Sequence, residues 1–317
     1  MARDDTSHGA RMSPPEQLPP VADPAAGTMM AMSARRGRRR APPHASGRRW
    51  NVGVDLGGTR VRVIAVDGDG RRRSAVSPAP GLAGLRRLLR DLWRRWDLSR
   101  ADVGALVVAT RGVWTTAERR AEARRLDRLA GRILVISDAE AAYLGAVGER
   151  PGVLLLAGTG SMALGRDGRG RWARAGGLGP LLGDDGSAFW IGREWLRAAG
   201  RDGDCPRARR IGRAPDAVRR VAALAPGVLA RARRGSRPAR QIVRGAQAAL
   251  AALLRATARE LDLRSPIVVS WAGGLLEDRA FRAGVWRAAG RGGPRLRPEP
   301  PRSRPVEAAL RLASRLA

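Results

Sequence analysis

From Trp50 onward, apolar and polar residues alternate along the chain in two different periods. Short and nearly continuous apolar runs predict buried strands over 51–56, 60–66, 103–110 and 132–137. The segments between the later strands predict helices: one with leucines at helical spacing over 84–96, a highly charged one over 116–130 and a short one over 139–147. Strands that alternate with helices in this way indicate an α/β protein with a largely buried sheet.

The opening pattern occurs twice. Residues 52–70 (VGVDLGGTRVRVIAVDGDG) and 153–170 (VLLLAGTGSMALGRDGRG) each contain an apolar strand, a glycine-rich tip, a second apolar strand and a turn with Asp and Gly. This internal repeat predicts two similar lobes that face each other across a cleft, an N-terminal lobe over 50–150 and a C-terminal lobe over 151–317. The second lobe continues with helices over 186–200 and 240–261, a strand over 266–274 and terminal helices.

Residues 1–49 differ from the rest of the chain. They mix Pro, Ala, Gly, Ser and Arg without periodicity, which predicts a disordered leader because this composition buries too little apolar surface to fold. They lack the order of basic and apolar residues of a secretory signal, and no apolar run approaches the roughly 20 residues of a membrane span. We therefore expect a cytoplasmic protein with no membrane partner.

Composition restricts the chemistry. The single cysteine, Cys205, excludes a disulfide framework and a cysteine-rich metal or iron–sulfur site within one chain. Both histidines, His8 and His44, lie in the leader, and none of the 60 basic residues is a lysine. Schiff-base chemistry and the lysine of a GxxxxGK phosphate loop are thereby excluded. Acid–base catalysis must depend on Asp, Glu or the single tyrosine, Tyr143.

The formal net charge of +31 raises the question of nucleic-acid binding. The arginines are spread over many segments instead of forming one stripe. Aromatic residues are only 4% of the chain and are scattered singly, so no base-stacking platform stands out. We expect no specific nucleic-acid partner, and only a salt-sensitive attraction to polyanions.

The two glycine-rich tips are candidate phosphate sites. Glycines at a hairpin tip let backbone N–H groups converge into a nest that suits phosphate oxygens, and Thr59, Thr159 and Ser161 add hydroxyl donors. Asp55 next to a phosphate site would be repelled unless a cation lies between them, which indicates Mg²⁺ held through water. Either tip alone is also compatible with an ordinary hairpin, but their matched spacing favours a ligand site.

The segment SDAEAAYLG (137–145) directly follows a predicted buried strand. Ser137 and Glu140 have the spacing of a capping box, which places Asp138 at the first helical position. Asp138 is therefore either a simple helix-start residue or a general base at the carboxyl end of a strand, where α/β sheets bind ligands. Without a histidine in the globular part, a carboxylate is the only plausible base for deprotonating an alcohol.

Two further glycine-containing segments carry candidate groups. LLGDDGS (181–187) supplies Asp184 and Asp185 before a predicted helix, where they are also compatible with an N-cap. WAGGLL (271–276) follows a predicted strand, and its glycines permit the close backbone approach that nucleotide binding requires. Gly-Gly after a strand is common, so this motif is weak by itself.

These motifs resemble those of the N-acetylglucosamine kinase-like branch of the BadF/BadG/BcrA/BcrD ATPase family, in the actin/hexokinase/Hsp70 superfamily. DLGGT is similar to the first phosphate hairpin of that family, SDAEAAYLG to the segment with its catalytic aspartate, and AGTGS to its second phosphate hairpin. RAGGLGPLLGDDGSAFWIGREWLRAA resembles the GGWGxxLGDEGSxxWIGxxAL signature, WAGGLLEDRAF the adenosine-side motif and PVEAALRLA the C-terminal helix. The resemblance covers about 51–317 and implies a duplicated ribonuclease H-like, actin-like ATPase fold with a nucleotide cleft between two lobes.

The resemblance also implies an ATP- and Mg²⁺-dependent carbohydrate kinase that phosphorylates a sugar or amino sugar, with a homodimer as a possible assembly. Asp138 would accept the proton of the sugar hydroxyl, and Asp55 would bind Mg²⁺ through water. Sugar contacts are implied for Asp138, Asp184 and Gly177, and Gly273 and Gly274 would border adenine. The terminal phosphates would be held by Gly57, Gly58, Thr59, Gly158, Thr159, Gly160 and Ser161.

The sequence departs from the family pattern at the acceptor end. Met162 follows GTGS where N-acetylglucosamine kinases typically have a sugar-binding Asn, Leu178 replaces the tryptophan of GGWG, and the loop 77–84 lacks an expected Asn. These departures leave open an ATP-binding regulatory or sensor module without phosphoryl transfer. An activator of 2-hydroxyacyl-CoA dehydratases, from the same family, is disfavoured because it needs cysteines for an iron–sulfur cluster and the only thiol is Cys205.

Overall fold

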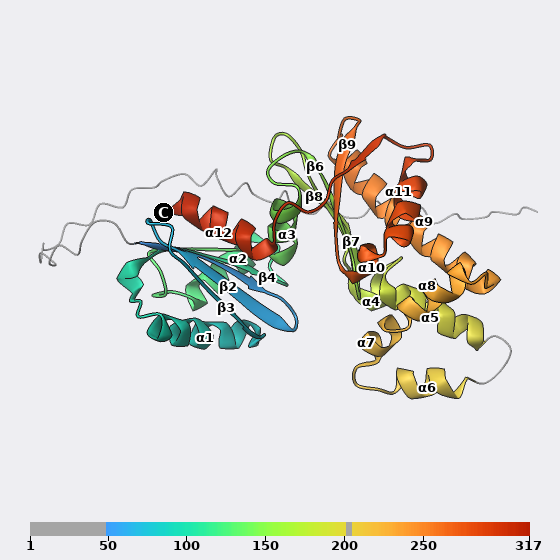
Figure 1. Cartoon of the computed structure of the whole chain (residues 1–317), viewed down its shortest axis with the longest axis horizontal. Helices are drawn as coiled ribbons and strands as arrows, with labels where there is room; N and C mark the ends of the chain where they lie inside the picture. Colours follow the sequence, from blue (N-terminus) through green and yellow to red (C-terminus); the bar gives the residue numbers. More distant parts are fainter. Residues whose placement is uncertain (1–48, 201–204) are drawn as a thin grey trace, which may run out of the picture.

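The computed structural model describes residues 49–200 and 205–317 (Figure 1). The predicted disordered leader over 1–49 therefore lies outside the described residues, apart from Arg49. The described part forms two lobes, each built on its own sheet. This agrees with the α/β architecture expected from the alternating pattern.

The first lobe is built on a five-stranded mixed sheet. Its strands are β1 (Trp50–Leu56), β2 (Arg60–Val66), β3 (Arg72–Pro78), β4 (Val103–Thr110) and β5 (Arg132–Ser137). They lie in the order β3-β2-β1-β4-β5, with β1 to β3 antiparallel and β1, β4 and β5 parallel. Every residue of β4 is buried, which explains its continuous apolar sequence.

The second lobe repeats this plan. Its strands are β6 (Gly152–Ala157), β7 (Ser161–Arg166), β8 (Trp172–Gly176), β9 (Ile267–Ala272) and β10 (Leu296–Pro298). In the order β10-β9-β6-β7-β8, strands β6 to β8 are again antiparallel, and β6, β9 and β10 are parallel. The internal repeat predicted from the glycine-rich hairpins is therefore confirmed as a repeat of sheet topology.

Helices of the first lobe cover both faces of its sheet. They are α1 (Gly81–Arg95), a 3-10 turn (Arg100–Asp102), α2 (Thr116–Arg125) and α3 (Asp138–Ala146). On one face, leucines of α1 pack against Val52, Val54 and Leu106. On the other, the last helix of the chain, α12 (Pro305–Leu316), packs against Ala105 and Ala109 of β4. Figure 1 shows α1 and α12 on opposite sides of the sheet.

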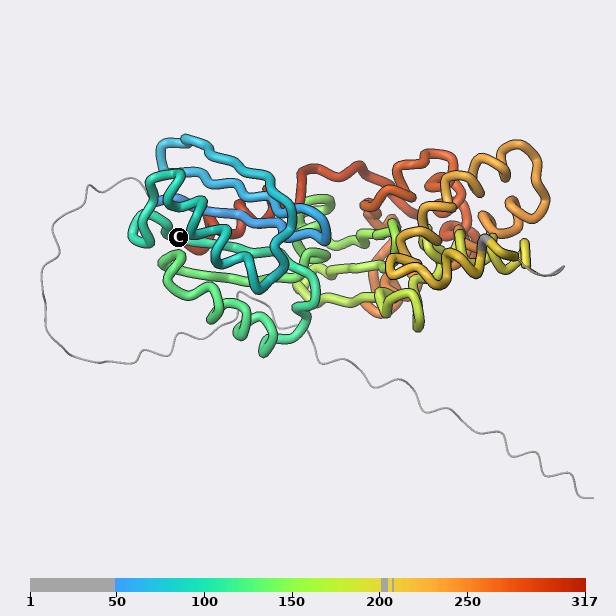
Figure 2. Tube along the Cα trace, turned by 90° about the horizontal axis from the view of Figure 1, so that it is seen from below, coloured from blue at the N-terminus to red at the C-terminus, as the bar shows by residue number. Residues whose placement is uncertain are grey.

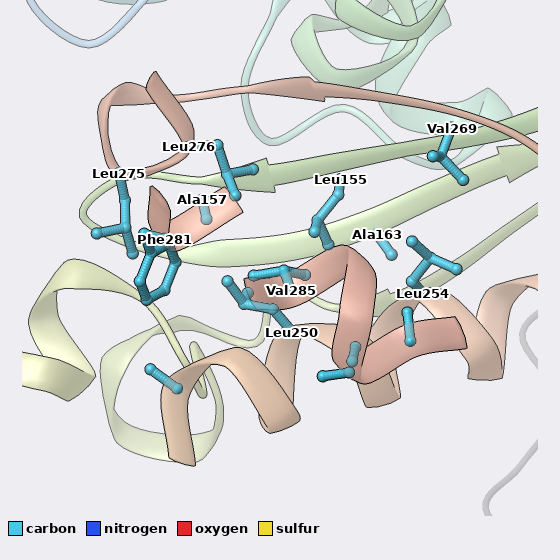
Figure 3. Close-up of a cluster of buried hydrophobic side chains, with 14 of the residues drawn as sticks. Leu155, Ala157, Ala163, Leu250, Leu254, Val269, Leu275, Leu276, Phe281 and Val285 are labelled. Carbon is cyan, nitrogen blue, oxygen red and sulfur yellow. The ribbon is translucent and has the colours of Figure 1, made fainter. Parts of the chain in front are cut away.

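The second lobe contains most of the remaining helices. They are α4 (Gly179–Leu182), α5 (Ala188–Ala199), α6 (Pro206–Gly212), α7 (Ala217–Ala222), α8 (Ala225–Arg233), α9 (Arg237–Glu260), α10 (Gly274–Glu277) and α11 (Arg279–Gly290). Leu250 and Leu254 of α9 meet Leu155 of β6, and Phe281 and Val285 of α11 complete this core (Figure 3). Within the described ranges, no helix is both long and apolar enough to cross a membrane.

Helix α3 joins the two lobes. Ala139, Tyr143 and Val147 at or next to this helix pack against Leu154 and Leu164 of the second sheet. The Tyr143 hydroxyl donates hydrogen bonds to two backbone carbonyls at the entry to that sheet, those of Arg150 at 2.7 Å and Gly152 at 3.3 Å. The position of α3 is therefore set by both lobes.

The chain returns to the first lobe at its end. After β10 it crosses from the second lobe, and α12 lies against β1, β4 and α3 (Figure 2). A Cβ atom at Gly53 would lie 2.4 Å from the Leu310 backbone nitrogen and 2.6 Å from the Val306 carbonyl oxygen, so only glycine permits this close approach. A single division at residue 150 consequently misplaces α12, which belongs with the first sheet.

We expect Gly53→Ala to destabilise the protein, because the new methyl group meets helix backbone that cannot rotate away. Overpacking of this kind typically costs about 1–3 kcal/mol. Urea denaturation followed by circular dichroism would measure the change in the free energy of unfolding. The matched control is Gly290→Ala, because a Cβ atom there meets nothing within 4 Å and alanine favours helix. Equal stability of Gly53→Ala and Gly290→Ala would contradict the close packing of α12.

Candidate active site

The first glycine-rich tip connects β1 and β2. The Gly57 N–H donates to the Arg60 carbonyl at 3.0 Å, which closes the turn and leaves Gly58 and Thr59 exposed. Asp55 is buried next to this tip at the carboxyl end of β1, and Arg62 donates to its Oδ2 atom at 3.4 Å. The acid and the tip thus lie together, as the sequence predicts.

The second tip connects β6 and β7 and is tied to α5. The Ala188 N–H donates to the Gly158 carbonyl at 2.9 Å, and the Phe189 N–H donates to the Thr159 carbonyl at 3.3 Å. The Ser161 hydroxyl donates to the Asp185 carbonyl at 2.7 Å. The signature segment over 174–199 therefore folds directly onto this hairpin.

Gly273 and Gly274 lie beside the second tip. A Cβ atom at Gly158 would be 3.9 Å from the Gly273 Cα atom and from the Gly274 nitrogen. Gly273 has a φ of +98°, and a Cβ atom there would be 2.4 Å from the Ala157 carbonyl oxygen. The fold brings together two glycine motifs that are far apart in sequence, and at Gly273 there is no room for a side chain.

Asp138 is the first residue of α3, directly after β5. The Ser137 N–H donates to Glu140 Oε2 at 2.9 Å, and the Asp138 Oδ1 atom accepts the Ala139 N–H at 2.8 Å. The predicted capping box is therefore present. Glu140 is itself buried and accepts a hydrogen bond from Arg119 of α2 at 2.8 Å. Removal of one partner of a buried ion pair typically costs about 3–5 kcal/mol, so this contact fixes the start of α3 firmly.

Asp138 and Asp55 share one electrostatic environment. Burial raises the pKa of Asp138, while the Ala139 N–H and the charge of Arg111 lower it and the charge of Asp55 raises it further. Burial likewise raises the pKa of Asp55, against the lowering effect of Arg62. The two carboxylates are thus close enough to influence each other, next to the first tip.

The residues around Asp55 fit a water-mediated Mg²⁺ site. Within 49–200 and 205–317, no group of three or more His, Cys, Asp or Glu side chains could enclose a metal ion. Mg²⁺ is commonly held by one or two carboxylates, several waters and substrate phosphates, and does not need a protein cage. Asp55, buried at the edge of a candidate phosphate site, is the donor that this mode requires.

Asp184 and Gly177 both contact the second hairpin. Asp184 has a φ of +59°, and its Oδ1 atom accepts the Ser161 N–H at 3.2 Å. Burial raises its pKa, the Ser161 N–H lowers it and the charge of Asp185 raises it. The Gly177 N–H donates to the Ser161 carbonyl at 3.0 Å, and a Cβ atom at Gly177 would be 2.9 Å from the Met162 sulfur. Contact of Asp184 and Gly177 with a sugar remains a prediction.

Two arginines next to these groups belong to none of the sequence motifs. Arg111 follows β4 and lies near Asp138, because Thr110 pairs with Ser137 of β5, and Arg119 pairs with Glu140. The signal for Arg111 was its place directly after a buried strand, where α/β sheets gather ligand-binding groups. The pairing of Arg119 has no sequence signal, because it depends on how α2 lies against α3.

Curated relatives match parts of the chain. An N-acetylmuramic acid/N-acetylglucosamine kinase of Clostridium acetobutylicum is 45% identical over 69 residues, which are 22% of each protein. An N-acetyl-D-glucosamine kinase of Dictyostelium discoideum is 29% identical over 167 residues, which cover 46% of this chain and 52% of that protein. The chain thus matches about half or less of the length of these relatives.

Solved structures share the fold over most of the chain. A proposed N-acetylglucosamine kinase from Chromobacterium violaceum has a TM-score of 0.62 and 26% identity, covering 84% of this chain and 99% of that one. The predicted actin-like ATPase fold is therefore confirmed. The sequence profile of the BadF/BadG/BcrA/BcrD ATPase family matches residues 52–292, which include both glycine-rich tips, Asp138 and Gly273–Gly274. The chain belongs to the BadF/BadG/BcrA/BcrD ATPase family.

Proposed function

We propose that this protein is an ATP- and Mg²⁺-dependent kinase that phosphorylates a hydroxyl group of a sugar or amino sugar. The observation that carries the proposal is the strand register of the first sheet, which brings Asp55 at the end of β1 and Asp138 directly after β5 to the same edge, beside the first glycine-rich tip. A phosphate site, a metal-binding carboxylate and a candidate base then lie in one place. The relatives named as N-acetylglucosamine kinases support a sugar as the acceptor.

The nucleotide is assigned to the glycine motifs of both lobes. The terminal phosphates are assigned to the N–H groups at 58–59 and 159–160 and to the hydroxyls of Thr59 and Thr159. The N–H groups of Gly57, Gly158 and Ser161 donate within the protein and shape the two tips. Gly273 and Gly274 border the adenine side, where their lack of side chains leaves room beside Gly158. Phosphoryl transfer depends mainly on positioning and charge neutralisation, which is what these groups supply.

Asp55 is assigned to Mg²⁺, held through water. When bound, the ion neutralises charge on the terminal phosphates of ATP. The contribution of the protein is a carboxylate that is already desolvated by burial and kept in place by Arg62. Asp55 therefore orients the ion without surrounding it.

Asp138 is assigned as the general base. Its carboxylate accepts the proton of the attacking sugar hydroxyl as the bond between that oxygen and the γ-phosphorus forms. The Oδ1 atom of Asp138 accepts a hydrogen bond from the Ala139 N–H, and the capping box of Ser137 and Glu140 holds Asp138 at the start of the helix. This arrangement orients the base before the acceptor binds.

The acceptor is assigned to Asp184 and Gly177 together with Asp138. Met162 packs against Gly177, and Leu178 is 61% exposed next to it. These side chains offer apolar contact at positions where the family pattern has Asn and Trp. An apolar side chain cannot replace a hydrogen bond to a sugar hydroxyl, so recognition of hydroxyls must come from other groups.

A second candidate function is an ATP-binding sensor or regulatory module without phosphoryl transfer. The same observation at Met162 favours it, because a methionine beside Gly177 removes a polar contact from the acceptor side. ATP binding measured by calorimetry, combined with no ADP formation over a panel of sugars and amino sugars, would support this module against the kinase.

We expect Asp138→Ala to lower ADP formation in the presence of a sugar acceptor by about 10²- to 10⁴-fold, the usual contribution of a general base. A coupled assay over a panel of N-acetylated and plain hexoses would measure turnover, and calorimetry would show that ATP still binds. Asp91→Ala, at a half-buried position on α1 outside the candidate site, is the control and should turn over normally. Equal turnover of Asp138→Ala and the wild type would refute the assigned base.

We expect Asp138→Asn to raise the thermal midpoint at pH 7, because the amide keeps the hydrogen bond from Ala139 and avoids burial of a charge. Since the folded-state pKa is raised, the wild type loses stability relative to the variant as the pH rises from about 3.8 through that pKa. The difference in thermal midpoint between Asp138→Asn and the wild type should therefore shrink when the pH is lowered into the range between about 3.8 and the folded-state pKa of Asp138. Thermal unfolding of both proteins at about pH 3.5–8 would measure this change, with Asp91→Asn as the control. If the difference in thermal midpoint did not depend on pH, burial of the Asp138 charge would not be its cause.

A further inference from the structure

Arg111 lies against the first glycine-rich tip. The Cβ position at Gly58 is 3.3 Å from the Arg111 Cζ and Nη2 atoms and 3.4 Å from Nη1, so the guanidinium group lies flat beside the tip. The strand register explains this placement, because Thr110, the last residue of β4, pairs with Leu56 of β1. Arg111 and the tip that follows Leu56 therefore leave the sheet side by side.

The same register places Arg111 near Asp138. Thr110 also pairs with Ser137 of β5, and Asp138 is the next residue. The positive charge of Arg111 lowers the pKa of Asp138 and so favours its basic form. Arg111 thus stands between the candidate phosphate site on one side and the candidate base on the other.

The guanidinium group of Arg111 is available for a ligand. Arg111 is exposed, and across 49–200 and 205–317 its guanidinium group has no carboxylate within 4.0 Å and no hydrogen-bond acceptor. The neighbouring arginines differ, because Arg62 pairs with Asp55 and Arg119 with Glu140. Among the described residues, Arg111 is therefore a cation at this site whose guanidinium group has no carboxylate partner.

The segment that carries Arg111 is held from three sides. The Trp114 N–H donates to Glu118 at 2.8 Å, and Arg119 donates to the Trp114 carbonyl at 3.3 Å. The guanidinium group of Arg174, from β8 of the second lobe, lies 4.3 Å from the centre of the Trp114 ring. Because Arg119 also bonds to Glu140, one side chain links the Arg111 segment to the start of α3.

We propose that Arg111 is a catalytic residue that contacts the phosphoryl group during its transfer. This inference rests on the proposed kinase function. The acceptor oxygen forms a bond to the γ-phosphorus, its proton passes to Asp138, and the bond to the bridging oxygen breaks with its electron pair leaving on ADP. Negative charge spreads over the phosphoryl oxygens in this step, and a planar guanidinium group can hydrogen-bond two of them at once.

The test compares the wild type with Arg111→Ala and Arg111→Lys in the intact protein. With a sugar that the wild type phosphorylates, we expect Arg111→Ala to lower kcat by about 10²- to 10³-fold and to change the KM for the sugar little. Lysine, which cannot form the bidentate contact, should restore only part of the rate. Millimolar guanidinium chloride should partly rescue Arg111→Ala, whereas a merely structural defect would not respond.

A binding measurement makes the test independent of the acceptor. ADP with Mg²⁺ and aluminium fluoride imitates the phosphoryl group in transfer, and ADP alone does not. We expect Arg111→Ala to lose at least 10-fold in affinity for the fluoride complex and to bind ADP like the wild type. Arg87→Ala, at an exposed position of α1, is the matched control and should behave like the wild type in both measurements.

The outcomes separate the two proposals. Unchanged turnover and unchanged binding of the fluoride complex by Arg111→Ala would overturn the role of Arg111 and leave the kinase proposal standing. A rise in KM confined to acidic sugars, at unchanged kcat, would also overturn it and assign Arg111 to the acceptor. A wild type that binds neither ATP nor ADP would overturn the proposed function and the inference with it.

Discussion

The packing of α3 between the two sheets is the constraint on which the candidate site depends. Its first residue is Asp138, and its buried face, centred on Tyr143, meets the second sheet. A shift of one lobe relative to the other would therefore move the base relative to the second glycine-rich tip. The Arg119–Glu140 pair adds a second restraint from α2, so the start of α3 is positioned from both lobes.

The sequence predicts well those elements whose residues are buried on both faces. The predicted strands over 60–66, 103–110 and 132–137 match the structure, because their apolar residues pack into the cores on the two faces of the first sheet. Strand β3 is not visible in this way: it is an edge strand in which exposed and half-buried residues alternate, with arginines and serines among them. The helix predicted over 116–130 ends at Arg125. Arg128 has a φ of +67°, which a continuing helix cannot contain, and the turn there buries Leu126 and Leu129.

Some residues of the candidate site can be predicted from local motifs, and others become apparent only from the fold. Motifs such as DLGGT and SDAEAAYLG identify groups that lie within one hairpin or one helix start, and the structure places them where the motifs predict. Arg111 can be assigned to the site only from the register of β4 with β1 and β5, which brings it next to the first glycine-rich tip and Asp138. No local pattern encodes that register, since it follows from pairing between strands that are distant in sequence.

The return of α12 to the first lobe affects how the protein can fold during synthesis. Ala105 and Ala109 of β4 and Gly53 of β1 stay uncovered until residues 305–316 are available. Synthesis proceeds from the N-terminus, so all residues of the second lobe's core are made after β4 and before α12. The second lobe, whose buried core lies within residues 153–289, therefore has its complete core segment before α12 is made. The lobe that is made first is therefore the one that finishes last.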